Sequence, residues 1–442
     1  MSSSAITLNH YQQLMRRLSH LSPYNAIHAV AIDSDDEMQS KLQPSLNAVI
    51  NQLALGNPQF STDEQQVTFI PCLEPVVLEM TVIALDAHIE QEMNYLFSST
   101  EFPLRFFIIV DQAQHYFSIT YNHWIGDGYA IRRLVETIFS HLRGQEVSPL
   151  TLNAPRIEDC FNPIYKRRTC YYRYLGVVQS FFRFSKAFRT NAHNEECTDP
   201  GCYTHFFERN VFQYLADFCK AHNVTLNDLF MAILAQIFGR ITQEKRAKLK
   251  SKLLKPRRDR IVIGVIADIR GSSQFSLRET FGLFLGFFYV SFKSPEKDSL
   301  PVLIQIIRAQ TKRIKNNYTA VKQFLLFKVQ TSMWDSRKSK RRQYRLFSKN
   351  TPITVGISNM NLNQHEGPLL NVVHQYIRFS PTAMVCPIVF NLTTFNGYLS
   401  LGINFRKACY SPSEVLAIKN EFVREIHALV KVNARSIDMA NT

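Results

Sequence analysis

The sequence is organised around Tyr121-Asn122-His123-Trp124-Ile125-Gly126-Asp127-Gly128, in which a histidine precedes an Asp-Gly pair by four residues. Alternating apolar residues in the runs 105–110 and 116–121 predict a hairpin of two strands in front of this stretch. Behind it, apolar residues at helical spacing predict a helix with Asp127 as its N-cap: Ile131, Leu134, Val135, Ile138, Phe139 and Leu142. We therefore expect His123 at a strand end just before a helix, where functional residues commonly lie.

The length and composition bound the fold. A chain of 442 residues exceeds what one core usually holds, which predicts two domains, at 1–150 and 205–442, joined by a connecting segment at 151–204. With 45% hydrophobic and 20% charged residues the chain is an ordinary globular protein. The net charge of +15 favours anionic partners, namely nucleic acid, an acidic membrane surface, or phosphate-bearing cofactors and carrier proteins, although a basic surface also serves plain solubility.

The cysteines and the apolar runs indicate where in the cell the protein is expected. The eight cysteines are scattered along the chain, which favours reduced thiols and a cytoplasmic protein. The first residues lack the charged and apolar regions of a signal peptide. The longest apolar run, Phe281 to Phe292, is about a dozen residues, well short of the roughly 20 that a spanning helix needs. We expect a soluble or membrane-peripheral protein.

The connecting segment carries two features with alternative interpretations. Tyr165 to Phe188 is rich in Arg, Lys, Tyr and Phe, which fits a connecting helix or an amphipathic helix on an anionic membrane. No nucleic-acid-reading motif accompanies it, so we expect no nucleic-acid partner. The segment 189–203 reads as an exposed linker. The residues His193, Cys197, Cys202 and His205 lack a common zinc spacing, and we predict no metal site.

Helices and strands are expected in both halves, which predicts a mixed α/β fold. A capping box marks the helix that starts at Thr225 and another marks the last helix at Ser411, while Asn396-Gly397 indicates a tight hairpin. The predicted helices are 9–20, 37–55, 83–97, 211–222, that from 225 onward, 300–316 and that from 411 onward; the predicted strands are 26–32, 66–70, 76–82, 261–267, 353–358, 387–394 and 398–405.

The residue types around His123 indicate base catalysis. An imidazole with an ordinary pKa of about 6.5 is a natural general base at neutral pH. No covalent nucleophile stands beside it in the sequence, which favours direct acyl transfer in a ternary complex. Asp127 either orients the ring or fixes the loop through an arginine, and Arg270 after the predicted central strand is the candidate partner. Gly126 and Gly128 permit a sharp backbone path.

The stretch from Ile119 to Ala130 resembles the HHxxxDG motif of the chloramphenicol acetyltransferase-like superfamily. This superfamily includes peptide synthetase condensation domains, polyketide-associated acyltransferases, alcohol acetyltransferases, wax ester synthases and plant BAHD acyltransferases. Further segments in the family's order extend the resemblance over almost the whole chain: Leu46 to Phe60, Thr225 to Gly239, Ala267 to Arg270 followed by Gly282, Val355 to Met360, and Asn396-Gly397.

The resemblance implies two chloramphenicol acetyltransferase-like α/β domains, each with a mixed sheet, and an active-site tunnel between them. It implies a monomer that binds no permanent cofactor and uses acyl-CoA or a phosphopantetheine thioester on an acyl carrier protein as co-substrate, with a small hydroxyl or amine acceptor. His123 is the implied general base, whereas Asp127, Gly128 and Arg270 are implied to be structural. The implied contacts to the substrate or oxyanion are Asn122, Trp124, Ser358 and Asn359.

The sequence departs from the family pattern at three points. Asn122 replaces the first motif histidine, the BAHD signature DFGWG is absent, and Asn361 replaces the glycine of SNxG. These departures disfavour the BAHD branch and a peptide-forming condensation domain. We predict a standalone acyltransferase. The alternatives are a catalytically inactive docking module and an amide-forming condensation enzyme.

Overall fold

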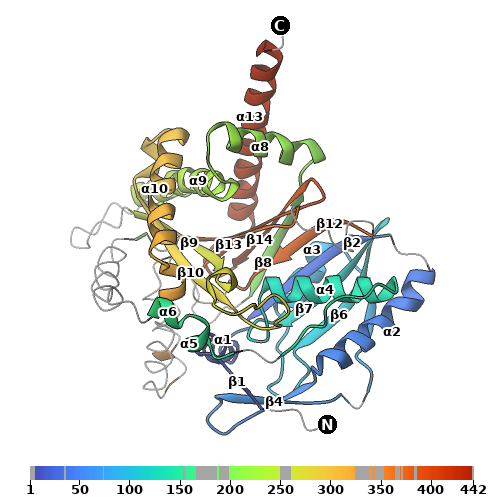
Figure 1. Ribbon diagram of the computed structural model, residues 1–442. Coiled ribbons are helices and arrows are strands. Elements are labelled where there is room, and N and C mark those ends of the chain that lie inside the picture. Colours follow the sequence, from blue (N-terminus) through green and yellow to red (C-terminus); the bar gives the residue numbers. More distant parts are fainter. Residues whose placement is uncertain are drawn as a thin grey trace.

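Two mixed β-sheets, one built mainly from each half of the chain, carry the fold, and a small antiparallel sheet lies at the N-terminal end (Figure 1). The small sheet consists of β1 (Ile6–Thr7), β4 (Gln66–Ile70) and β3 (Asn57–Phe60). The computed structural model describes residues 5–33, 36–72, 74–152, 155–165, 187–188, 199–248, 260–323, 339, 342–343, 353–363, 369, 372–382 and 386–440. The prediction of a mixed α/β fold is confirmed.

The first large sheet has the strand order β12-β2-β7-β6-β5. The predicted hairpin in front of His123 is present, because the antiparallel strands β6 and β7 alternate apolar residues on both faces. Helices α2 and α4 cover one face, and α3 packs on the other. The elements are β2 (Asn25–Ile32), β5 (Leu78–Val82), β6 (Leu104–Asp111), β7 (Gln114–Asn122), α1 (His10–Ser19), α2 (Asp36–Leu53), α3 (Leu85–Met93) and α4 (Gly128–Leu142).

Strand β12 (Val373–Phe379) belongs to the second half of the chain but completes the first sheet. It pairs antiparallel with β2, with Arg378 opposite His28, and Figure 1 shows the two strands side by side. The predicted boundary at 205–442 is therefore corrected, since this one strand crosses over. Nothing in a local pattern could assign a partner strand more than three hundred residues away.

The second large sheet has the order β10-β9-β11-β13-β14-β8, and helices α8, α9, α10 and α13 pack against it (Figure 1). Both predicted capping boxes form, between Thr225 and Asp228 and between Ser411 and Glu414. Asn396 and Gly397 both have positive φ, as the predicted tight hairpin requires. The elements are β9 (Arg260–Asp268), β10 (Leu285–Lys293), β11 (Val355–Asn361), β13 (Ile388–Phe395), β14 (Tyr398–Arg406), α8 (Arg209–Ala221), α9 (Leu226–Lys248), α10 (Leu300–Asn316) and α13 (Pro412–Ala440).

The connecting segment differs from its predicted extent. Its last residues form β8 (Pro200–Phe206), which pairs with β14 at the sheet edge, so the linker expected at 189–203 ends earlier. Cys202 is buried in β8. Two short helices, α5 (Ile157–Cys160) and α6 (Asn162–Tyr165), precede it. Residues 166–186, including nearly all of the basic aromatic run, lie outside the described residues, as do His193 and Cys197.

The described residues contain neither a cluster of metal-ligating side chains nor a single helix suited to span a membrane. No group of three or more His, Cys, Asp or Glu side chains in this part of the chain is placed to hold a metal ion. Within the same residues no single helix is both long and apolar enough to cross a membrane. The apolar run that begins at Phe281 contains strand β10, which pairs with β9.

Candidate active site

A cavity of about 580 Å³ lies where the two halves of the chain meet. Its wall includes α1, the end of β7 and the start of α4 from the first half, and β9, β10, β11 and β12 from the second. His123, Gly128, Ser358 and Asn359 all line it. The structure thus brings together four of the predicted site residues in one space. A volume of this size suits a small-molecule substrate.

His123 follows β7 directly and is held by its backbone and by two aromatic rings. Its N–H donates to the Tyr24 carbonyl at 3.1 Å, and its imidazole lies 5.6 Å from the Tyr121 ring and 6.2 Å from the Tyr24 ring, between centroids. Only 6% of the residue is exposed. Burial lowers the pKa of His123 to about 4, although its own carbonyl and the charge of Asp127 oppose that shift. The imidazole is therefore neutral at pH 7 and able to accept a proton.

Nδ1 and Nε2 of His123 have different roles available to them. Nδ1 is buried and has no hydrogen-bond partner in another residue among those described. The residue's own backbone carbonyl stabilises a proton on the ring and so opposes the lowering of the pKa by burial. In the tautomer with the proton on Nδ1, the Nε2 lone pair is the basic position.

Asp127 and Arg270 join the two halves beneath His123. Asp127 is fully buried and caps α4 by accepting from the Ala130 N–H at 2.9 Å. Its other carboxylate oxygen accepts from Arg270 Nη1 and from the Phe284 N–H, both at 2.7 Å. The contact implied between Asp127 and Arg270 is therefore present, and it positions the loop that carries His123.

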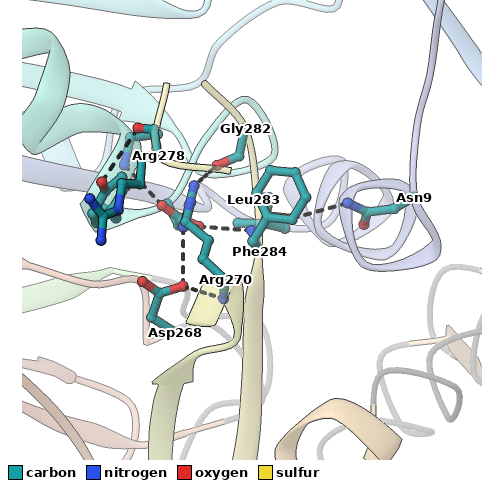
Figure 2. A network of polar contacts seen from close by, with 10 residues as sticks. Asn9, Asp268, Arg270, Arg278, Gly282, Leu283 and Phe284 are labelled. Atoms are coloured by element: carbon teal, nitrogen blue, oxygen red, sulfur yellow. Dashed lines mark hydrogen bonds and ion pairs between the residues drawn. The ribbon is translucent and has the colours of Figure 1, made fainter. Parts of the chain in front are cut away.

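Arg270 is neutralised on several sides. Nη1 also lies 3.3 Å from Asp268 Oδ1, and Nη2 donates to the Gly282 carbonyl at 3.1 Å (Figure 2). Asp127 and Asp268 together raise the pKa of Arg270 against the effect of burial. Two carboxylates thus neutralise this guanidinium, whose Nε is buried without a hydrogen-bond partner among the described residues, and the group has a structural role.

Ser358 and Asn359 lie on β11, in the wall that belongs to the second half. Ser358 is buried, and its carbonyl accepts from Arg378 Nη2 at 3.4 Å. Asn359 Oδ1 is buried without a hydrogen-bond partner in the described residues. Both residues line the same cavity as His123, and their contact with a substrate or oxyanion stays a prediction.

Asn122 and Trp124 do not line the cavity of His123, and the substrate contacts implied for them stay a prediction. Both line a separate small hollow. The Trp124 ring stacks on Phe69 at 6.4 Å and lies edge-on to Phe60 at 5.3 Å, between centroids. Strand β7 ends at Asn122, and the Ile125 N–H donates to the Asn122 carbonyl at 3.1 Å, so the chain turns at His123. The replacement of the first motif histidine therefore lies outside this cavity.

Three basic residues of the cavity wall were not predicted. His28 on β2 and Arg378 on β12 are cross-strand neighbours, and Arg132 lies one turn into α4. The sequence signal that could have found the first two is a charged or titratable residue inside an otherwise apolar buried strand. The opposite part of the wall is aromatic and apolar, formed by Tyr11, Leu14, Met15, Leu18, Tyr24, Leu285, Phe287 and Tyr289.

Comparison with known proteins finds similarity in structure but not in sequence. No protein-family profile matches the chain, and no curated protein sequence matches it. Among solved structures, the TRI3 trichothecene 15-O-acetyltransferase from Fusarium sporotrichioides aligns with a TM-score of 0.70 at 11% identity, over 96% of this chain and 95% of that one. The first condensation domain of the calcium-dependent antibiotic synthetase, in complex with a substrate analogue, aligns with a TM-score of 0.69 at 12% identity, over 97% of each chain.

An epimerization domain shares the same architecture. The domain from the third module of tyrocidine synthetase B aligns with a TM-score of 0.62 at 11% identity, over 98% of each chain. Identities this low establish the fold and leave the reaction open. The chain has the two-lobed fold of the acetyltransferase, condensation and epimerization structures with which it aligns.

Proposed function

We propose that this protein transfers an acyl group from a thioester to a hydroxyl or amine, with His123 as the general base. One observation carries the proposal: a neutral histidine lies in a cavity formed by both halves of the chain. An aligned acetyltransferase and an aligned condensation domain support it at the level of fold. The net charge of +15 suits a donor bearing phosphates, either coenzyme A or a phosphopantetheine on an acidic carrier protein.

The proposed reaction proceeds by direct attack. Nε2 of His123 takes the proton of the acceptor O–H or N–H as the acceptor's lone pair forms a bond to the thioester carbonyl carbon. The resulting tetrahedral oxyanion collapses by breaking the carbon–sulfur bond, and the departing thiolate receives the proton from the imidazolium. The products are the acylated acceptor and a free thiol, and His123 returns to its neutral form.

The opposite wall supports stabilisation of the oxyanion. Ser358 is buried beside the cavity and its hydroxyl is a hydrogen-bond donor. A well-placed donor to an oxyanion lowers an activation barrier by about 3–4 kcal/mol. Burial of His123 keeps its imidazole neutral before the reaction, while Asp127 offsets part of the cost of protonating it.

The test is thiol release from a panel of acyl-CoA and acyl-carrier thioesters with mixed alcohol and amine acceptors. His123→Ala is expected to lower the rate by about 100-fold or more, the usual contribution of a general base. His141→Ala is the matched control, because His141 lies at the exposed end of α4 and does not line the cavity. Equal turnover in both variants would contradict the assignment of the base.

Mass spectrometry of ligands that co-purify with His123→Ala protein identifies the acceptor and the acyl group. A bound acyl donor or acceptor supports the proposal. Absence of thiol release with every donor, together with retained binding of a carrier protein, would instead favour a docking module.

A further inference from the structure

Two nitrogen donors converge on one point of the cavity wall. His28 and Arg378 stand directly opposite each other on β2 and β12. Arg378 Nη1 lies 3.2 Å, and His28 Nε2 lies 3.5 Å, from the position that a Cβ on Gly128 would take. Gly128 is the first residue of α4, whose N-terminus is capped by the Asp127 carboxylate. The two basic side chains are therefore the sources of positive potential at this corner of the cavity.

Arg378 is a buried cation without a carboxylate. It is 4% exposed, and its donors reach only neutral oxygens: Nε meets Thr393 Oγ1 at 3.0 Å and Nη2 meets the Leu392 carbonyl at 3.2 Å. Among the described residues no acidic group lies within ion-pair distance of it, and Nη1 makes no hydrogen bond. Burial lowers its pKa to about 10. A buried charge is normally paired, so this one lacks its expected partner.

Neighbouring charges do not supply that partner. Arg132, which also lines the cavity, shares the carboxylate of Glu136 with Arg133, at 2.5 and 2.9 Å. One carboxylate against two guanidinium groups leaves this cluster positive as well. Its surplus charge adds to that of Arg378.

His28 can donate toward the cavity. Its Nδ1 lies 2.7 Å from the hydroxyl of Tyr376, which stays protonated because burial raises the pKa of Tyr376. In the tautomer in which this phenol donates to Nδ1, the ring proton of neutral His28 lies on Nε2. Burial, together with Arg378, His123 and Arg132, keeps the pKa of His28 well below its ordinary value. In that tautomer both His28 Nε2 and Arg378 Nη1 offer hydrogens to an acceptor.

We propose that His28 and Arg378, beside the start of α4, bind a carboxylate of the acyl acceptor, so that the acceptor is a hydroxy acid or an amino acid. Because it names the acceptor of the proposed reaction, this inference rests on the proposed function. A planar carboxylate matches the guanidinium and accepts from both donors at once. His123 lines the same cavity, where it is available to the nucleophile of the bound acid.

The experiment measures binding and does not require turnover. Three acid and amide pairs are titrated calorimetrically into the full chain: benzoate with benzamide, 3-hydroxybenzoate with 3-hydroxybenzamide, and decanoate with decanamide. At least one acid is expected to bind about 10- to 100-fold more tightly than its amide, the usual worth of a charged hydrogen bond. Equal binding within every pair, or no binding of any acid at millimolar concentration, would overturn the proposal.

Matched variants locate the site. Arg378→Gln is expected to abolish the preference for the acid, and Arg378→Lys to retain part of it. Arg16→Gln is the control, because Arg16 is a buried arginine that does not line this cavity. Gly128→Ala keeps both donors and places a methyl group between them, so it should weaken binding of the acid and leave binding of the amide unchanged. This variant tests the site even if Arg378→Gln does not fold. An acid preference that survives both Arg378→Gln and Gly128→Ala would overturn the proposal.

A competition distinguishes the acceptor from the acyl chain as the source of the carboxylate. Acetyl-CoA and succinyl-CoA are added in turn to the complex with the preferred acid. If the site binds the carboxylate of the acceptor, neither acetyl-CoA nor succinyl-CoA displaces the acid. Displacement by succinyl-CoA alone would assign the site to a dicarboxylic acyl group and overturn the acceptor assignment. His123→Ala should retain the acid preference, so loss of thiol release in every assay leaves this binding test intact.

Discussion

Arg270 and Arg378 are both buried arginines beside the start of α4, but their surroundings have opposite character. Arg270 lies between Asp127 and Asp268, whereas Arg378 has only neutral oxygens among the described residues. A buried guanidinium that is paired with carboxylates stabilises the fold. A buried guanidinium without a carboxylate lowers the stability of the ligand-free protein, and binding of an anion offsets that cost. The difference separates a structural residue from a binding residue of the same type.

The comparison is tested most strongly by Arg270→Met. This change leaves Asp127 fully buried without its cation, which we expect to lower the free energy of unfolding by about 3–5 kcal/mol. Urea unfolding followed by circular dichroism measures it. Arg424→Met, in an exposed pair with Glu421, is the control and should cost less than about 1 kcal/mol. Equal losses in the two variants would remove the distinction drawn here.

Acid pH favours protonation of His123, which lines the cavity. The folded-state pKa of His123 is about 4 against an ordinary 6.5, so between these values the unfolded chain binds a proton that the folded chain does not. The free energy of unfolding should therefore be fully maintained above pH 6.5 and should fall as the pH drops toward 4, by up to about 3 kcal/mol for this group.

Single substitutions show how much each group contributes to the pH dependence of the free energy of unfolding. His123→Gln should remove part of the fall, and Arg378→Met should reduce it further because Arg378 helps to lower the pKa of His28. The exposed His222 gives the control variant His222→Gln, which should retain the full slope. An unchanged slope in His123→Gln would show that the imidazole is not buried in neutral form.

Asp127→Asn has a smaller expected effect than removal of Arg270. Asparagine still caps α4, and Arg270 keeps Asp268 as a partner. We expect a loss of about 1–3 kcal/mol from the weakened hydrogen bonds to the guanidinium. Asp127→Ala should cost about 1 kcal/mol more, since the cap is also lost. Denaturant midpoints measure both, and a neutral Asp127→Ala variant would contradict the anchoring role.

Arg378→Met is expected to have the smallest effect on stability. Replacement by an apolar side chain of similar length removes an uncompensated buried charge. The free energy of unfolding should therefore fall by less than about 1 kcal/mol, or should rise. The thermal midpoint without ligand measures this. A loss as large as that of Arg270→Met would show that Arg378 is structural and would remove the contrast between the two arginines.

Local chemistry made much of the fold predictable. Alternation located β6 and β7, capping boxes located the starts of α9 and α13, and Asn396-Gly397 located a hairpin. Each of these features depends on residues close together in sequence. The pair Asp127 and Arg270 spans 143 residues, and it was indicated by the position of Arg270 after a predicted central strand together with the family resemblance.

The rest depended on pairing that no local pattern encodes. His28 and Arg378 become neighbours only because β12 joins β2. Strand β8 was missed because its short sequence contains Pro200 and Gly201, which usually disfavour strands, yet both lie at an edge where they are tolerated. The separation of Asn122 and Trp124 from the cavity depends on the turn that follows β7, which the motif alone does not specify.

The crossover of β12 also constrains how the chain can fold during synthesis. Until residue 379 has left the ribosome, β2 remains an open sheet edge with unpaired backbone groups. The corner between His28 and Arg378 does not exist in that interval, and neither half alone contains it. We expect separately produced halves to aggregate, and a mixture of the two to recover anion binding only where β12 inserts beside β2. The corner can therefore form only after β12 has been made and has paired with β2, so that anion binding reports a chain in which this pairing is complete.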